Sequence, residues 1–324
     1  MIILKAIFFI LFGFVLLVKG ADYFVDGAAG IAKKLGIPSI IIGLTVVAFG
    51  TSAPELAVSI SAAVHGSNDI AVGNVVGSNL FNLLVVLGFS AIMKPIVVDK
   101  GVLKRDYPLS LVAVILLGVL CLDGVTRTNN EYIDISRWEG LILLAFFAYF
   151  MYLTIREGLK ARKEKGSIEE KEEEIMPIWK SLLFSVLGLA GIIIGGELTV
   201  GGAKSLATEL GMSQALIGLT IVAIGTSLPE LVTSVVAAKK GENDIALGNV
   251  LGSNIFNIFL ILGLSSAILP MQIDVSYIYD ILILLTVSAI VYLPILIRKK
   301  VGRGFGFACV ICYVAYMAYI CIRG

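Results

Sequence analysis

Long apolar stretches recur along this chain, and short polar connections separate them. A membrane-spanning helix needs about 20 apolar residues, so the pattern predicts ten such helices. The first stretch lacks the small-residue cleavage site of a signal peptide, so we take it as a retained span. The predicted spans are 3–30, 38–64, 69–93, 106–122, 138–155, 177–204, 213–238, 244–269, 277–297 and 304–322.

The amino-acid composition also indicates a protein that lies in the lipid bilayer. Hydrophobic residues make up 58% of the chain and charged residues 15%, and the mean hydropathy is +0.98. These values are typical of an all-α integral membrane protein and exclude an ordinary globular domain. The formal net charge of +1 argues against a nucleic-acid partner and leaves the lipid bilayer as the expected environment.

A block of 40 residues occurs twice, 175 positions apart and without a gap. Residues 43–82 return as residues 218–257, and 27 of the 40 aligned positions are identical. If each block belongs to a longer repeat, the ten predicted spans divide into five for each repeat, an odd number, so the two repeats must enter the membrane with opposite polarity. Inverted repeats of this kind are common among secondary transporters. We expect a first five-helix repeat at 1–155, a charged linker at 156–176 and a second five-helix repeat at 177–324.

The basic residues predict the orientation. If the chain starts outside the cell and crosses ten times, 19 of the 25 Lys and Arg residues fall on the inner connections. Because cytoplasmic loops carry the excess of positive charge, we expect both termini outside a plasma membrane and the 156–176 linker in the cytoplasm. This linker is basic and then acidic, which is typical of a solvated connector.

Polar chemistry is concentrated in the repeated block, beginning with the motif GTSAPE. Pro54 has no amide hydrogen and clashes with the carbonyl four residues earlier, so the helix should kink or break there. The freed acceptor is the Gly50 carbonyl, and we expect the Ala48 carbonyl to turn away from the helix as well. Thr51 and Glu55 are four residues apart and share one helical face. Such irregular backbone is tolerated in a membrane only inside protein or beside a water-filled cavity.

The second copy repeats this arrangement around Pro229, with Thr226, Ser227 and Glu230 beside it. Together the two copies offer carboxylates, hydroxyls and carbonyls, which are the oxygen donors that Ca²⁺ prefers. Na⁺ would use subsets of the same ligands. Zinc or copper would require His or Cys, and neither occurs in these motifs.

The two carboxylates carry a formal charge of −2, which one Ca²⁺ or two to three Na⁺ would balance. An empty and fully ionised pocket would be costly to move through a low-dielectric barrier. This penalty favours exchange of one kind of ion for another over uncoupled leakage.

Ser78 and Asn82 are four residues apart, as are Ser253 and Asn257 in the second copy. Two interpretations are open for these four side chains. They can join neighbouring helices by hydrogen bonds, or they can coordinate a cation or its water.

The motif pairs GTSAPE with GNVVGSNLFN, and GTSLPE with GNVLGSNIFN, closely resemble the paired repeats of the sodium/calcium exchanger superfamily, especially its prokaryotic members. The resemblance covers nearly the whole chain. It implies a Ca²⁺ ion between Glu55 and Glu230, with Thr51 and Thr226 contributing oxygen atoms. The sodium positions that it implies would use Ser52, Ser78, Ser227, Ser253 and the carbonyls of Ala48 and Ala223.

One departure from the family is the amide at both Asn82 and Asn257, where some relatives have aspartate. The site therefore lacks a third acid. Family members that co-transport potassium rely on an acid there, so the resemblance argues against potassium coupling. We expect a monomeric antiporter that exchanges Ca²⁺ for Na⁺ by alternating access and needs no cofactor. A proton/calcium antiporter using the same glutamates is the nearest alternative. A channel is less well supported, because its selectivity-determining parts would normally recur around an axis. A membrane enzyme is less well supported, because the one histidine, His65, lies outside the paired motifs.

Three polar positions near the motifs have simpler interpretations. We expect Asp69 to cap the helix that follows it, and His65 to be a solvated loop residue. Asp22 is either part of a gate or the local partner of Lys19.

Overall fold

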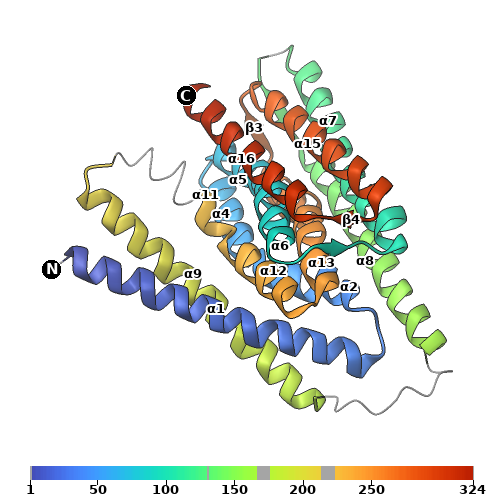
Figure 1. Cartoon of the computed structure of the whole chain (residues 1–324). Coiled ribbons are helices and arrows are strands. Elements are labelled where there is room, and N and C mark those ends of the chain that lie inside the picture. Colours follow the sequence, from blue (N-terminus) through green and yellow to red (C-terminus); the bar gives the residue numbers. More distant parts are fainter. Residues whose placement is uncertain (1, 130, 166–175, 213–222, 324) are drawn as a thin grey trace. The chain divides into compact units, whose positions relative to one another are not determined.

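Long helices form most of the chain (Figure 1). This computed structural model describes residues 2–129, 131–165, 176–212 and 223–323. Within these ranges, eight helices are long and apolar enough to cross a membrane, or nine if the two helices on either side of Ser52 form one span. The all-helical membrane fold is thus confirmed. The predicted span 213–238 begins in residues 213–222, which lie outside the described ranges.

The bounds of most long helices extend the predicted spans by a few residues, as expected for helices that continue past the apolar core of a bilayer. They are α1 (Ile2–Leu35), α7 (Tyr107–Arg127), α8 (Arg137–Lys165), α9 (Ile178–Glu209), α15 (Tyr277–Arg298) and α16 (Arg303–Arg323).

The helices that carry the repeated block are built from shorter pieces. In the first copy they are α2 (Ser39–Ile42), the π-helix η1 (Gly43–Val47), α3 (Ala48–Thr51), α4 (Ala53–Val64), α5 (Asn68–Phe81), the π-helix η2 (Asn82–Val86) and α6 (Leu87–Met93). In the second copy they are α11 (Ala223–Thr226), α12 (Leu228–Lys240), α13 (Asn243–Ile255), the π-helix η5 (Phe256–Leu262) and α14 (Gly263–Ile268). A further π-helix, η3 (Val102–Asp106), precedes α7.

The chain divides into two compact units. Unit 1 contains residues 1–54 and 154–249, and unit 2 contains residues 55–153 and 250–324. Each unit therefore combines segments from both halves of the chain.

In unit 1, α1 and α9 lie side by side and antiparallel (Figure 1). Small residues recur every seven positions at their contact. A Cβ added at Gly13 would lie 2.7 Å from the Gly195 carbonyl oxygen, and one at Gly188 would lie 2.4 Å from the Phe24 nitrogen and 2.7 Å from the Gly20 carbonyl oxygen. Only glycine allows main chains to approach this closely. We call the four pairs at this contact the glycine seam: Ala6 with Gly202, Gly13 with Gly195, Gly20 with Gly188, and Gly27 with Ser181.

The repeated block is interrupted where the proline motif predicts a break. Ser52, with φ −83° and ψ 8°, separates α3 from α4, and Ser227, with φ −92° and ψ 7°, separates α11 from α12. Pro54 and Pro229 each fall in the first turn of the helix that follows. A missing amide hydrogen costs nothing there because the first turn has no intrahelical acceptor for it. Proline therefore restarts the helix, and the serine before it forms the break.

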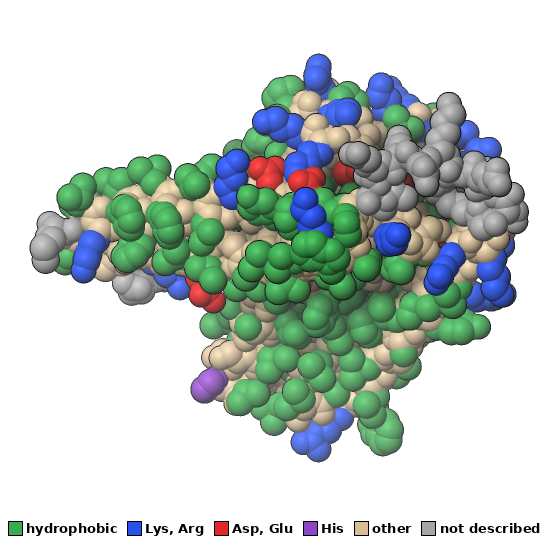
Figure 2. Space-filling view, turned by 90° about the horizontal axis from the view of Figure 1, so that it is seen from below, with side chains coloured by type: hydrophobic (Ala, Val, Ile, Leu, Met, Phe, Trp, Pro, Cys, Tyr) green, Lys and Arg blue, Asp and Glu red, His purple; other side chains and the backbone are tan. Residues whose placement is uncertain are grey.

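In unit 2, α6 packs against α16, and α7 packs against α15. The spans that contain the motif asparagines are the most enclosed. In the most apolar window of Asn68–Met93, 83% of the residues are buried, and in that of Asn243–Ile268, 94% are buried. In α1 and α16 the corresponding values are 17% and 11%. Figure 2 shows hydrophobic side chains spread over the visible surface, as expected for helices that face lipid.

Two short antiparallel ribbons connect helices in unit 2, although the sequence predicts only helices. Strands β1 (Ile96–Val97) and β4 (Lys300–Val301) pair with each other, as do β2 (Ile133–Ile135) and β3 (Met271–Ile273).

The expectation that Asp69 caps its helix is wrong. Its Oδ1 atom accepts a hydrogen bond from the Asp274 amide at 3.0 Å instead, which joins the start of α5 to the connection after β3.

The first part of the predicted linker is helical. Helix α8 continues beyond residue 155 to Lys165, while residues 166–175 lie outside the described ranges. The sequence EGLKARKEK is rich in good helix formers and places opposite charges three or four positions apart, which stabilises a solvated helix.

Candidate cation-binding site

Glu230 is completely buried near the start of α12, in unit 1. The Ser52 hydroxyl donates to its Oε1 atom at 2.9 Å. The helix break at Ser52 and this glutamate are 178 positions apart in the chain, and both are predicted site residues. This contact brings the proline motif of the first copy to the glutamate of the second.

Thr51, the residue before Ser52, makes a second contact with the other copy of the repeated block. Its Oγ1 atom lies 2.9 Å from Oδ1 of Asn249, and it is also within reach of the Val47 and Ala48 carbonyls at 3.1 and 3.4 Å. The Ala48 carbonyl accepts the Ser52 amide at 3.0 Å, so the expectation that it turns away from the helix is wrong.

Asn249 links three helical pieces of unit 1. Its Nδ2 atom donates to the Glu230 main-chain carbonyl at 3.3 Å and to the Ser234 hydroxyl at 2.9 Å, while its Oδ1 atom faces Thr51. Ser234 in turn lies 3.4 Å from the Ala246 carbonyl. The segment of α12 that carries the glutamate is thereby tied to α13.

The same contacts occur in unit 2, 175 positions earlier. The Asn74 Nδ2 atom donates to the Glu55 main-chain carbonyl at 3.4 Å and to the Ser59 hydroxyl at 3.0 Å, and Ser59 lies 3.5 Å from the Ala71 carbonyl. Glu55 is completely buried, like Glu230. We call each set of three residues a glutamate clamp: Glu55, Asn74 and Ser59 in unit 2, and Glu230, Asn249 and Ser234 in unit 1.

Asn82 and Asn257 lie at the π-helical turns η2 and η5 of unit 2. Asn82 donates to the side chain of Asn254 at 3.1 Å, and Asn257 donates to that of Asn79 at 3.0 Å. Interhelical hydrogen bonding, one of the two interpretations left open, is therefore present. It uses only the amide nitrogen atoms. Among the described residues, no hydrogen-bond donor reaches the buried Oδ1 atom of either side chain or the Ser253 hydroxyl.

The remaining predicted residues line the same buried segments. Ser78 in unit 2 is 3% exposed, and in unit 1 Thr226 is 8% exposed and Ser227 is fully buried. Ala223 forms the first residue of α11. Within the described ranges no three His, Cys, Asp or Glu side chains gather in a way that could hold a metal ion. The donors in these segments are instead single carboxylates accompanied by hydroxyl, amide and carbonyl oxygen atoms.

Sequence reasoning missed the asparagines and serines that hold the predicted residues in place. A signal for them was present, because Asn74 lies four positions before Ser78 and eight before Asn82, on the same helical face, and the second copy repeats this spacing. The missed residues are Ser59, Asn74, Asn79, Ser234, Asn249 and Asn254.

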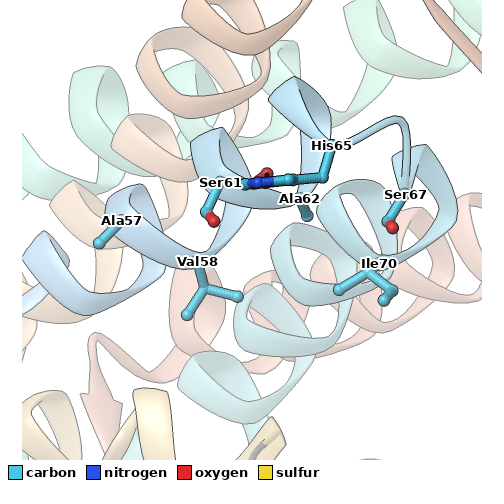
Figure 3. Close-up of a pocket in the computed structure, with 7 residues that line it drawn as sticks. All are labelled: Ala57, Val58, Ser61, Ala62, His65, Ser67 and Ile70. Carbon is cyan, nitrogen blue, oxygen red and sulfur yellow. Dashed lines mark hydrogen bonds between the residues drawn. The ribbon is translucent and has the colours of Figure 1, made fainter.

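His65 is exposed at the end of α4, as predicted, and its Nδ1–H donates to the Ser61 carbonyl at 2.7 Å. It borders an open pocket of about 470 Å³ between α4 and α5 (Figure 3). The other lining residues are Ala57, Val58, Ser61, Ala62, Ser67 and Ile70. Two serine hydroxyls without a carboxylate among the lining side chains are fewer oxygen donors than Ca²⁺ requires.

Asp22 takes part in more than the expected local pair. Its carboxylate lies 3.9 Å from Lys19 and 3.5 Å from Lys240 at the end of α12. Lys240 also donates to Asp26 at 2.7 Å. An ion-pair group therefore joins α1 to α12 within unit 1.

Comparisons with known proteins identify the family. The family model described as sodium/calcium exchanger protein matches residues 5–156 and 180–322. The chain is 37% identical over 316 residues to the inner membrane protein YrbG of Escherichia coli, covering 95% of this chain and 94% of that protein. It is 35% identical over 339 residues to the sodium/calcium exchanger MaX1 of Methanosarcina acetivorans, covering 96% and 97% of the two chains.

Solved structures agree with the sequence comparisons. The sodium-calcium exchanger NCX_Mj, studied without Na⁺ and Ca²⁺, superimposes with a TM-score of 0.84 at 34% identity, covering 98% of this chain and 99% of that one. The fold is thus that of a membrane exchanger, and its chemistry is cation/Ca²⁺ antiport, not enzyme catalysis. This chain belongs to the sodium/calcium exchanger protein family.

Proposed function

We propose that this protein moves Ca²⁺ across the plasma membrane in exchange for Na⁺, by alternating access to one set of ligands. The observation that carries the proposal is the matched pair of glutamate clamps. In each clamp the glutamate is completely buried, and the asparagine donates to the glutamate main-chain carbonyl and to the serine hydroxyl. The two clamps are 175 positions apart in the chain. A buried carboxylate in a membrane protein is costly, and a bound cation compensates for that cost.

Glu55 and Glu230 together are the proposed Ca²⁺ ligands, assisted by Thr51 and Thr226. Their combined formal charge of −2 matches one Ca²⁺, and oxygen atoms of several kinds suit its adaptable coordination. The proposed Na⁺ ligands are oxygen atoms of the surrounding side chains and main chain. They belong to Ala48, Ser52, Ser78, Asn82, Ala223, Ser227, Ser253 and Asn257.

We propose that ten spans form two inverted five-helix repeats. The antiparallel contact of α1 with α9 supports this, because these two helices are equivalent in the two copies. The distribution of basic residues supports termini outside the cell and a cytoplasmic linker. One chain supplies every proposed ligand, which supports a monomer as the functional unit.

The coupling ion is proposed to be Na⁺, supported by the names of MaX1 and NCX_Mj as sodium/calcium exchangers. The test is ⁴⁵Ca²⁺ uptake into proteoliposomes loaded with Na⁺, with K⁺-loaded vesicles and vesicles carrying only a pH gradient run in parallel. Uptake is expected only with internal Na⁺. Uptake driven by the pH gradient alone would instead establish a proton/calcium antiporter.

The ligand assignment has its own test. Glu55→Gln and Glu230→Gln each remove one charge while keeping the side-chain shape, and each is expected to abolish Na⁺-driven ⁴⁵Ca²⁺ uptake. Glu131→Gln is the matched control, because this glutamate is exposed in a connection. Uptake at the wild-type rate in either buried variant would disprove the assignment.

A further inference from the structure

Four buried asparagines of unit 2 form a closed set of hydrogen bonds. Asn79 donates to the main-chain carbonyl of Asn254 at 3.3 Å, and Asn254 donates to the main-chain carbonyl of Asn79 at 3.4 Å. Asn257 donates to the side-chain oxygen of Asn79, and Asn82 donates to that of Asn254. All four are at most 2% exposed. We call this set the asparagine ring.

The main-chain carbonyls determine how every amide in the ring is oriented. A carbonyl can only accept, so the side chain of Asn79 must turn its nitrogen toward Asn254. The side-chain oxygen of Asn79 then faces Asn257, so the Asn257 side chain must donate its Nδ2–H to that oxygen, at 3.0 Å. The oxygen of Asn257 consequently lies on the side away from the ring. The same reasoning applies from Asn254 to Asn82.

This orientation leaves the side-chain oxygen atoms of Asn82 and Asn257 without a partner inside the ring. Within the described part of the chain, the Oδ1 atoms of Asn82 and Asn257 are buried and receive no hydrogen bond. A buried acceptor without a partner costs about 1–3 kcal/mol. A cation, or a water molecule that a cation carries, would satisfy it, whereas an amide nitrogen in the same place would repel a cation.

We infer that Asn79 and Asn254 are positioning residues of the cation site. They hold Asn257 and Asn82 so that a neutral oxygen, never an amide nitrogen, is presented to Na⁺ or to the water around it. This inference rests on the proposed function and adds two residues to it. The ring also disfavours an ionised acid at position 257, because one carboxylate oxygen would meet the acceptor oxygen of Asn79.

The test uses double-mutant cycles, with the Na⁺ concentration for half-maximal ⁴⁵Ca²⁺ exchange as the readout. Asn257→Ala, Asn82→Ala, Asn79→Leu and Asn254→Leu are each expected to raise that concentration about tenfold, the usual cost of losing a ligand or its support. Asn79→Leu with Asn257→Ala should be no worse than the worse single variant, because Asn79 acts through Asn257. Asn254→Leu with Asn82→Ala should behave likewise.

Pairs on the same helix supply the contrast. Asn79→Leu with Asn82→Ala disturbs both arms of the ring, so the combined loss should exceed that of either single variant. Ser288→Ala is the control for loss of a buried hydroxyl, since the one hydrogen bond described for the Ser288 hydroxyl runs to the Leu284 carbonyl of its own helix, at 2.7 Å. It should leave the Na⁺ dependence unchanged.

The inference is wrong if the losses of Na⁺ sensitivity multiply in the cross-helix pairs, Asn79 with Asn257 and Asn254 with Asn82. It is also wrong if only substitutions on the same helix are coupled. If a leucine variant does not yield folded protein, Asn79→Ser and Asn254→Ser replace the leucine variants in the same double-mutant cycles. Wild-type protein that transports Ca²⁺ without Na⁺ would refute the proposed function instead, so the two failures are distinguishable.

Discussion

The glycine seam of unit 1 and the asparagine ring of unit 2 show two opposite ways of joining equivalent helices. The seam brings main chains together through residues with little or no side chain, so its contacts are non-directional. The ring joins the α5–η2 segment to the α13–η5 segment through amides whose donors and acceptors are fixed. Non-directional contacts tolerate sliding, whereas directional hydrogen bonds hold one arrangement.

We therefore expect α1 and α9 to slide against each other within unit 1, and the segments that the ring joins to keep one arrangement within unit 2. Five substitutions would break or sharpen the comparison, and they are given from the largest expected effect to the smallest.

Gly188→Val should be the most damaging. Its Cβ atom would lie 2.4 Å from the Phe24 main-chain nitrogen, which cannot move aside as a flexible side chain would. Overpacking of this kind costs about 1–3 kcal/mol or more. We expect either no monodisperse protein or ⁴⁵Ca²⁺ exchange below about 1% of wild type, a loss of about 2.7 kcal/mol in rate terms. Gly201→Ala on the same helix is the control, because its Cβ atom would meet open space. Normal exchange by Gly188→Val would refute close packing at the seam.

Asn249→Leu should come next, because it removes the central member of one glutamate clamp. The Glu230 carbonyl, the Ser234 hydroxyl and Thr51 would each lose a partner. Loss of such a supporting residue typically weakens metal affinity about 10- to 100-fold. The half-saturating Ca²⁺ concentration in transport measures this.

The equivalent change in the other clamp, Asn74→Leu, should have a similar effect. If only one of the two variants weakens Ca²⁺ affinity, the clamps are not functionally equivalent, and the paired-glutamate interpretation would have to be revised.

Thr51→Val should have an intermediate effect, since it keeps the shape and removes one hydroxyl. The Oδ1 atom of Asn249 then loses its partner at 2.9 Å. An unmade buried hydrogen bond costs about 1–3 kcal/mol, which should appear as a lower melting temperature together with weaker Ca²⁺ affinity. Thr51→Ser retains the hydroxyl and should restore most of both. A serine variant as weak as the valine variant would show that the methyl group, and not the hydroxyl, matters.

Lys240→Gln should have the smallest effect. The lysine side chain is 28% exposed and pairs with Asp22 and Asp26, which are 36% and 45% exposed. Exposed ion pairs contribute about 0–1 kcal/mol and are screened by salt. We expect a change in exchange rate of less than about threefold that disappears at high ionic strength. A larger, salt-independent change would mean that this ion-pair group controls the movement of α1.

Much of the fold followed from the sequence because membranes impose simple rules. Apolar length located the spans, and the prolines of GTSAPE and GTSLPE located the helix breaks within two residues. The continuation of α8 to Lys165 was missed, because hydropathy marks the bilayer core and says nothing about helix that extends into water. The strand ribbons were missed because each joins loops about 140 to 200 residues apart, and no local pattern encodes such pairing.

For the site, the sequence by itself determined which residue types are repeated, and that repetition is what predicts Glu55 and Glu230 as the central acids. Only the tertiary structure decided how those acids are held. The Ser52–Glu230 contact, the two clamps and the ring all join segments whose distance in the chain says nothing about their distance in space. The direction in which an amide points depends on the donors and acceptors around it, and these become neighbours only when the helices pack.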